Sequence, residues 1–319
     1  MKLKDLKKMA AILSQSNQYR VTEKYQRPEF YNIGDSDPKL IGVFLDIEAT
    51  GLSSAQDKLI ELGMVKFEYS ENGRIFRLLD EFSRYQDPHM SIPEYISKLT
   101  GITDDMVNGH QINEHEAASY LQEVDIIIAH NAQFDRTFFE MTFPAIPPKA
   151  WGCSMCDIDW KIEGISSHKL EYIAYKYNFF YEGHRAVIDS LAGIHILAQD
   201  LPNSKQPVLK QLLANALQLK FKLWATDSPY DSKDLLRARG YRWSNHPTTN
   251  YKSWSIELAE DKVAEEIDYL RSNIYGGSTL NMPVEIVDAY SRFSNNYKHL
   301  QNATKYQDKI EWIKMLCLK

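Results

Sequence analysis

Residues 40–52 have the sequence LIGVFLDIEATGL, in which a short apolar run ends in two acidic residues. The run Leu40–Ile47, rich in Ile, Val, Phe and Leu, predicts a buried β-strand. Asp46 and Glu48 stand two positions apart, so in a strand they point to the same face of the sheet. Adjacent carboxylates in an apolar strand repel one another and lose hydration, and a divalent cation is the expected compensation. Taken alone, such a common pair favours the simpler interpretation that both acids face water.

The elements around this strand predict an α/β fold. Further strands are expected at Leu59–Tyr69, Arg74–Tyr85, Asp125–Ala129 and Trp151–Met155. Helical patterns occupy residues 92–99, 114–124, 133–143, 169–177 and 185–201. A meander of strands followed by strand–helix alternation predicts a mixed sheet flanked by helices.

A second acidic motif follows the strand expected at residues 125–129. Residues 130–135, HNAQFD, lead into a helix whose first turn holds Asp135. The helix dipole favours a carboxylate at this position, which suits a functional acid. The same position also fits a plain first-turn acid, with Asn131 as a plain N-cap.

The third motif, residues 183–189 (GHRAVID), opens the helical pattern at 185–201. At about 100° per residue, His184 and Asp189 would point about 140° apart on one helix and would not share a face. We therefore expect Asp189 to project from the helix and His184 to lie on the preceding loop, where a proton-transferring group can move with substrate. The alternative is an exposed loop histidine without a function.

In this order and spacing, the three motifs resemble those of the DEDDh exonuclease superfamily, which includes the epsilon proofreading subunit of bacterial DNA polymerase III. The matching residues are Asp46, Glu48, Thr50 and Gly51; His130, Asn131, Phe134 and Asp135; and His184, Ala186 and Asp189. The resemblance covers about residues 40–200 with no catalytic position substituted, and the chain up to about Phe293 resembles an epsilon-like bacterial subgroup. It implies an RNase H-like sheet and a 3′→5′ exonuclease.

The resemblance further implies hydrolysis with two divalent ions, and oxygen-only ligands indicate Mg²⁺ or Mn²⁺ rather than zinc. Asp46 would bridge both ions. Glu48 and Asp189 would complete one site, and Asp135 would hold the second ion through water. His184 would be the general base that takes a proton from the attacking water. The products would be nucleoside monophosphates.

The resemblance also implies where the strand end binds. The implied substrate-binding residues are Ala49, Thr50, Leu52, Asn131 and Phe134. Thr50 would contact the sugar or phosphate of the 3′-terminal nucleotide, and Leu52 its base. The motifs do not read the 2′-hydroxyl; DNA is the favoured substrate, in repair or turnover, and RNA trimming is the alternative.

Two non-catalytic functions are also open. A polymerase-associated accessory subunit would act mainly by binding, but a globular segment occupies the place of the flexible tail that such a subunit would need. An inert nucleic-acid-binding protein would be expected to lack one of the acids, and all of them are present. A polymerase or repair protein is therefore kept as a possible partner only.

Breaks in the pattern divide the chain into segments, with the linker expected at residues 202–207 (PNSKQP). The expected segments are a lead-in at 1–39, the exonuclease domain at 40–202, a small α/β module at 208–295 and a helical tail at 296–319. Within the module, residues 221–255 interleave basic and aromatic side chains and resemble a small domain that accompanies DNA-handling enzymes. Arg239, Arg242 and Trp243 would contact single-stranded nucleic acid there. An equally supported alternative is that the tryptophans form the core of the module and the arginines form its solvated surface.

Composition argues against several classes of protein, including membrane-spanning and disulfide-stabilised ones. No apolar run approaches the roughly 20 residues that cross a bilayer, and the N-terminus lacks the features of a signal peptide. Three cysteines are too few for a disulfide framework, which favours the cytoplasm. Cys153 and Cys156 form a C-x-x-C that we interpret as buried strand cysteines. The net charge of −6 argues against coating nucleic acid by bulk electrostatics, but not against local binding through bound cations.

Overall fold

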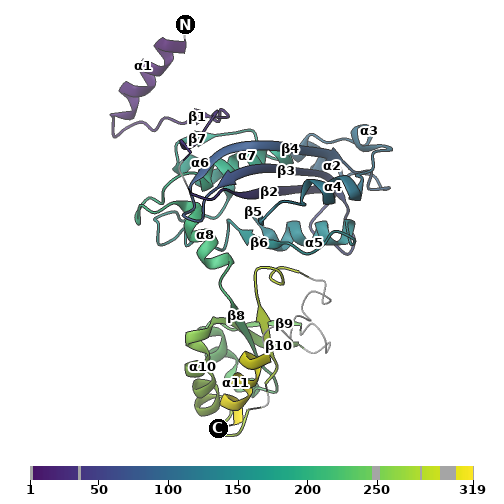
Figure 1. The fold of residues 1–319 in the computed structure, drawn as a ribbon, viewed down its shortest axis with the longest axis vertical. Helices are drawn as coiled ribbons and strands as arrows, with labels where there is room; N and C mark the ends of the chain where they lie inside the picture. The colour runs from purple at the N-terminus through teal and green to yellow at the C-terminus, as the bar shows by residue number, and fades with distance from the viewer. Residues whose placement is uncertain (1–2, 35–36, 246–251, 281, 295–306, 319) are drawn as a thin grey trace. The chain divides into compact units, whose positions relative to one another are not determined.

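The computed structural model describes residues 3–34, 37–245, 252–280, 282–294 and 307–318 (Figure 1). The chain divides into two compact units, residues 1–216 and 217–319. The first unit holds all three acidic motifs, and the second holds the basic and aromatic segment. Within the described residues, no helix has the length and apolar character that crossing a membrane requires.

A five-stranded mixed sheet forms the centre of the first unit. Its strands are β2 (Leu40–Ala49), β3 (Leu59–Tyr69), β4 (Ile75–Tyr85), β5 (Ile126–Ala129) and β6 (Ala150–Cys153). The order is β4-β3-β2-β5-β6; β3 is antiparallel to β2 and β4, whereas β5 runs parallel to β2 and β6. Val43, Phe44 and Leu45 of the central strand are fully buried, so both faces of β2 are covered. This confirms the expected RNase H-like mixed sheet.

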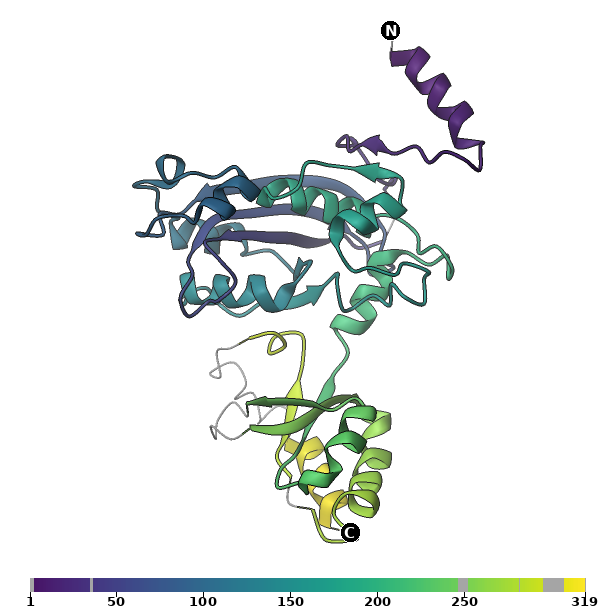
Figure 2. The ribbon, with the colours of Figure 1, turned by 180° about the vertical axis from the view of Figure 1, so that it is seen from behind.

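Helix α7 (Ala186–Leu197) packs along β2 and β3 (Figure 2). Two glycines permit this close approach, because a Cβ on Gly193 would lie 2.2 Å from the Phe44 ring and one on Gly63 would lie 2.5 Å from the Ala186 backbone. The other helices of the unit are α1 (Leu3–Ser14), α2 (Glu94–Thr100), α3 (Asp104–Val107), α4 (Glu114–Tyr120), α5 (Ala132–Thr142), α6 (Leu170–Lys176) and α8 (Val208–Ala216). The five expected helices are present with similar bounds.

The lead-in is attached to the first unit by backbone hydrogen bonds. Strand β1 (Glu23–Lys24) pairs in parallel with β7 (Phe179–Phe180). The Arg20 guanidinium donates to the carbonyls of Tyr175 and Lys176 at 2.8 and 2.9 Å. These contacts come from segments about 155 residues apart, so a two-residue strand is stable here only through its partner.

The unit boundary lies after Ala216, beyond the linker expected at residues 202–207. The reason is α8, which packs on β6 and buries its apolar face. Leu212 fills the space beside Gly152, where a Cβ would lie 2.7 Å from its side chain. Residues 208–216 therefore complete the core of the first unit and do not begin the C-terminal module.

The second unit is a four-stranded antiparallel sheet with helices on one face (Figure 1). Its strands, in the order β11-β8-β10-β9, are β8 (Lys220–Ala225), β9 (Arg242–Asn245), β10 (Lys252–Ala259) and β11 (Val284–Val287). Its helices are the 3₁₀ turn η1 (Tyr230–Ser232), α9 (Lys233–Ala238), α10 (Glu260–Asn273) and α11 (Gln307–Leu318). Phe221 and Leu223 of β8 pack in one core with Leu236 of α9 and Ile267 of α10. This confirms a small α/β module.

The described part of the expected tail, helix α11, packs into this core. Residues 295–306 lie outside the described residues. In α11, Ile313 is fully buried and Cys317 is 5% exposed, and both belong to the core cluster of the unit. Arg271 also donates to the Leu316 carbonyl at 2.5 Å. A short helix with two buried apolar positions is stabilised by this packing rather than by its own propensity.

Candidate active site

Three carboxylates meet beside the end of β2. Asp46 and Glu48 stand on the strand itself, and Asp189 lies in the first turn of α7, which packs across that strand. One ligand oxygen from each side chain lies within 4.8 Å of the others, and all three side chains are half-buried. The structure thus brings together three of the four acids that the motifs predict as metal ligands.

Burial and mutual repulsion disfavour the ionised form of these carboxylates. Burial raises the pKa of Asp46 well above its ordinary value, and neighbouring carboxylates, led by Asp135 and Asp189, raise it further. Burial, then the charges of Asp189 and Glu61, raise the pKa of Glu48 to about 8. Such a set is stable in ionised form only beside a cation. Oxygen donors at this spacing fit a divalent metal ion.

Asp135 lies next to this cluster, in the first turn of α5, and is 3% exposed. It is not one of the three grouped acids, but its charge is the largest electrostatic influence on Asp46. Burial raises the pKa of Asp135, while the backbone N–H of Ile47 donates to its carboxylate and opposes that shift. The acid is therefore held between α5 and the end of β2, and a plain solvent-facing first-turn acid is excluded.

His184 lies on the loop before α7, as the helix geometry predicts. Its backbone has a positive φ of 65°, a conformation that is uncommon outside glycine but is enriched for Asn, Asp and His. Its side chain is 45% exposed, and Nε2 lies 3.8 Å from Oε1 of Glu171. The loop thus presents the imidazole to solvent beside the Asp189 carboxylate.

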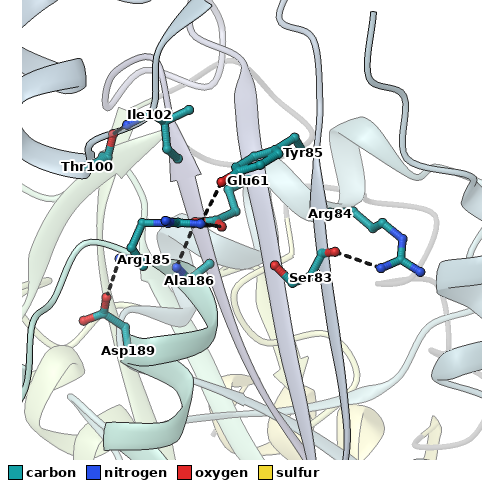
Figure 3. Close-up of polar contacts among 9 residues, drawn as sticks. All are labelled: Glu61, Ser83, Arg84, Tyr85, Thr100, Ile102, Arg185, Ala186 and Asp189. Atoms are coloured by element: carbon teal, nitrogen blue, oxygen red, sulfur yellow. Dashed lines mark hydrogen bonds and ion pairs between the residues drawn. The ribbon is translucent and has the colours of Figure 1, made fainter. Parts of the chain in front are cut away.

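Glu61 and Arg185 form an ion pair beside the cluster. The sequence motifs alone indicated no role for either residue. Glu61 of β3 is 1% exposed, and its Oε1 accepts from Nη2 of Arg185 at 2.9 Å. Figure 3 shows that Arg185 also donates to the Tyr85 hydroxyl, at 2.7 Å, and that its backbone N–H points to Asp189. The sequence signal for this ion pair was an acidic residue inside an apolar strand, since a buried carboxylate requires a cationic partner.

The geometry agrees with the comparison to known families, in which the exonuclease family RNase_T matches residues 43–197. The exonuclease match therefore spans just under half of the chain and includes all three acidic motifs. The chain is 40% identical over 100 residues to the PolC-type DNA polymerase III of Clostridium perfringens, a match that covers 31% of this chain and 6% of that protein. Over 169 residues it is 32% identical to the PolC-type DNA polymerase III of Halalkalibacterium halodurans, covering 49% of this chain and 11% of that protein. The chain thus spans only a small part of the length of these relatives.

A solved structure of exonuclease I resembles the chain with a TM-score of 0.46 and 17% identity, over 88% of this chain and 72% of that one.

His130, the first residue of the second motif, has a structural position in the exonuclease domain. Its Nε2 lies 2.6 Å from the His168 carbonyl and its Nδ1 lies 2.9 Å from the Ser154 hydroxyl. Because a carbonyl only accepts, Nε2 carries the proton and Nδ1 accepts from the hydroxyl. Burial lowers the pKa of His130 to about 4, so the ring is neutral at pH 7.

The two cysteines of the C-x-x-C differ in environment. Cys153 ends β6 and is buried, as expected, with its Sγ 3.3 Å from the His130 carbonyl. Cys156 is exposed, which corrects the expectation that both are buried strand residues. The strand ends at Cys153 and the chain turns over the next residues, so the second cysteine leaves the sheet.

The turn after β2 distributes its residues unequally between the core and the surface. Thr50 is fully buried; its hydroxyl donates to Asp57 at 3.2 Å and accepts from the Lys58 N–H at 3.0 Å. These bonds hold the turn, and they occupy the hydroxyl that was expected on the sugar or phosphate. Leu52, expected against the base, is 89% exposed. Ala49 is buried, so only its backbone is suited to a substrate contact.

The second motif leaves two side chains near the surface. Asn131 is the N-cap residue of α5 and is exposed, but its side chain makes no cap hydrogen bond. Phe134 is partly buried, with its ring centroid 4.8 Å from that of Phe138.

In the second unit, the three expected contact residues do not form one surface. Arg239 donates to Glu266, a buried acid, at 2.8 Å, and its guanidinium therefore holds α10. Arg242 and Trp243 are neighbours on β9, and consecutive strand residues point to opposite faces. Trp243 is 55% exposed and packs edge-on against Trp254, with the ring centroids 5.4 Å apart.

Proposed function

We propose that this protein removes nucleoside monophosphates from the 3′ end of a nucleic-acid strand by metal-dependent hydrolysis. The observation that carries the proposal is the grouping of the Asp46, Glu48 and Asp189 carboxylates within 4.8 Å, with Asp135 beside them. A cluster of like charges that is partly removed from water is costly to maintain without a cation. The exonuclease family match over residues 43–197 supports the same reaction.

The donor set fits Mg²⁺ or Mn²⁺, because it consists of carboxylate oxygens alone. Asp46, Glu48 and Asp189 would hold one ion, and Asp46 with Asp135 a second. When bound, such ions lower the pKa of water and stabilise the leaving 3′-oxygen. The protein contributes the fixed carboxylates, two from one strand and one from each of two helices.

His184 is the proposed general base. Its imidazole stands half-exposed on the loop before α7, within reach of a water placed beside Asp189. Nε2 would take the proton from that water, and the Glu171 carboxylate, 3.8 Å away, would stabilise the imidazolium that forms.

The strand end would bind at the turn after β2. Leu52, exposed and apolar, would stack against the terminal base, while Ala49 and Thr50 would contribute backbone groups and a rigid turn. Asn131 and Phe134 would contact the terminal nucleotide from the start of α5. The Thr50 hydroxyl is already hydrogen-bonded to Asp57 and Lys58, so it would not contact the sugar.

DNA is the substrate we favour, because the relatives reported above are named DNA polymerases. An RNA-trimming exoribonuclease is the alternative. The same relatives support a place in DNA repair or turnover, with a polymerase as a possible partner. Three free cysteines fit a cytoplasmic location.

The second unit would bind single-stranded nucleic acid through Trp243. The Arg237 guanidinium lies 5.9 Å from the centroid of the Trp254 ring, against which Trp243 packs, so a cation lies next to the tryptophan pair. Base stacking with a nearby positive charge is a common way to hold a single strand. Arg242 would act on the other face of the sheet.

A time course on 5′-labelled single-stranded DNA, duplex DNA and RNA tests the reaction, with Mg²⁺, with Mn²⁺ and with EDTA. We expect metal-dependent ladders that shorten from the 3′ end, fastest on DNA. Faster shortening of RNA would establish the alternative substrate. No degradation of any substrate by folded protein would refute the proposed reaction and favour a binding function.

A further inference from the structure

The N-terminus of α7 is tied to the central sheet by a single buried carboxylate. Oε2 of Glu61 accepts from the backbone N–H of Ala186 at 3.0 Å and from Nε of Arg185 at 3.2 Å. Its Oε1 accepts from Nη2 of Arg185 at 2.9 Å. Glu61 is 1% exposed, so a carboxylate from β3 satisfies both the side chain of the Arg that precedes the helix and the first N–H of the helix.

Arg185 is held from a second strand as well. Tyr85 of β4 stands opposite Glu61 in the strand register, and its hydroxyl lies 2.7 Å from Nη2 of Arg185. The backbone N–H of Arg185 donates to Oδ2 of Asp189 at 3.0 Å. Arg185 thus links two strands of the sheet to a proposed metal ligand (Figure 3).

Arg185 lies between two residues of the proposed active site in the sequence. The residue before it is His184, the proposed base, and four residues after it comes Asp189. A fixed guanidinium therefore limits the movement of the loop that carries His184 and the rotation of the turn that carries Asp189. Asp46 and Glu48 belong to β2, which is hydrogen-bonded to the strand that carries Glu61.

We propose that Glu61 and Arg185 are positioning residues, which hold His184 and Asp189 in register with Asp46 and Glu48. This role rests on the proposed function, which supplies the reaction. The link between Glu61, Arg185 and Asp189 should affect metal affinity as well as turnover. Groups that orient metal ligands typically change metal affinity or activity by about 10–100-fold when they are removed.

The charge of the pair is as important as its geometry. Glu61 stands directly opposite Glu48, so without Arg185 a further negative charge would face the cluster. With Arg185 in place, Glu61 is compensated within the protein, and the three cluster acids keep their charge for the metal. Removal of the Glu61 charge alone would leave the guanidinium as a competing cation close to Glu48.

The test uses the full chain with Glu61→Gln, Arg185→Lys and the double variant Glu61→Gln/Arg185→Lys. Mn²⁺ affinity is measured by calorimetry on metal-free protein, and kcat and KM on 5′-labelled DNA. We expect each single variant to weaken Mn²⁺ binding and lower kcat by about 10-fold or more with little change in KM. The double variant should lose no more than the worse single variant, because the two residues act as a unit.

Glu68→Gln is the matched control, since Glu68 lies on the same strand and pairs with Arg77 of β4 at 3.4 Å away from the site. It should leave both readouts unchanged. If Glu61→Gln fails to fold, Arg185→Lys, at a position that is 38% exposed in its side chain, carries the test. Folded variants that keep Mn²⁺ affinity and kcat within twofold of the parent overturn the proposal. If the parent degrades no nucleic acid, the proposed function fails, and the Mn²⁺ titration still decides the positioning role.

Discussion

Glu48 of β2 lies directly opposite Glu61 of β3 in the antiparallel register of the central sheet. Like charges in this arrangement are destabilising unless each has a partner. Arg185 is the partner of Glu61, whereas burial and the charges of Asp189 and Glu61 raise the pKa of Glu48 to about 8. Two identical side chains on adjacent strands therefore differ in function: one is compensated inside the protein, and the other contributes its charge to the site.

Asp46→Asn should stabilise the metal-free protein while it abolishes activity. Asn keeps the shape of the side chain but removes the buried charge whose pKa the neighbouring acids raise. The melting temperature without metal should rise, its further increase with Mn²⁺ should vanish, and kcat should fall by about 10³-fold or more. Thermal melts with and without Mn²⁺, together with the DNA time course, measure all three effects.

The control for that prediction is Asp105→Asn, an exposed acid on α3. It should change neither the melt nor the turnover. Near-normal turnover by Asp46→Asn, or an Mn²⁺-induced shift equal to that of the parent, would show that the ligand assignment is wrong.

The main features of the catalytic unit could be predicted from local signals. Residues 40–47 are apolar because β2 is covered on both faces, and the Asp46–Glu48 spacing follows from strand geometry. The placement of His184 before α7 and Asp189 within it followed from helical periodicity alone. These inferences need no knowledge of which strands pair.

The features that were missed depend on contacts that the local sequence pattern does not specify. Glu61 lies in an apolar run, and only the strand register and the packing of α7 reveal its bond to Arg185, 124 positions away. The burial of Thr50 follows from the Asp57 and Lys58 groups that fold back over it. Residues 208–216 have the pattern of any amphipathic helix, so the sequence does not indicate which core they complete.

The partly buried His130 should make folding stability depend on pH. Its pKa is about 4 in the folded protein and near its ordinary 6.5 when unfolded, so the unfolded chain binds more protons between these values. The stabilisation is complete above about pH 6.5 and is lost as pH falls toward 4, by about 3 kcal/mol. Urea unfolding at pH 7 and pH 4.5 should show a smaller pH difference in His130→Gln, whose amide can still donate to the His168 carbonyl. Equal pH differences in both proteins would contradict a neutral buried imidazole.

Trp243→Ala should weaken binding of single-stranded DNA without affecting the fold. The side chain is 55% exposed, and loss of one stacked base is worth about 1–3 kcal/mol, or roughly 5- to 150-fold in Kd. Fluorescence anisotropy with labelled oligo-dT in EDTA measures binding without cleavage. Trp243→Phe should retain most of the affinity, and Met315→Ala, which removes an equally exposed side chain from α11, should retain all of it. An unchanged Kd for Trp243→Ala would leave the tryptophan with a packing role only.

His184→Asn separates the proposed base from the metal site. Asn tolerates the positive φ of 65° at this position, so the loop can keep its conformation, but the amide cannot accept the proton from water. We expect kcat to fall by about 10²–10⁴-fold, while calorimetry shows Mn²⁺ affinity close to that of the parent. A variant that keeps kcat within twofold of the parent would assign the proton transfer to another group. One that loses Mn²⁺ affinity as well would show that His184 supports the carboxylate cluster rather than the proton transfer.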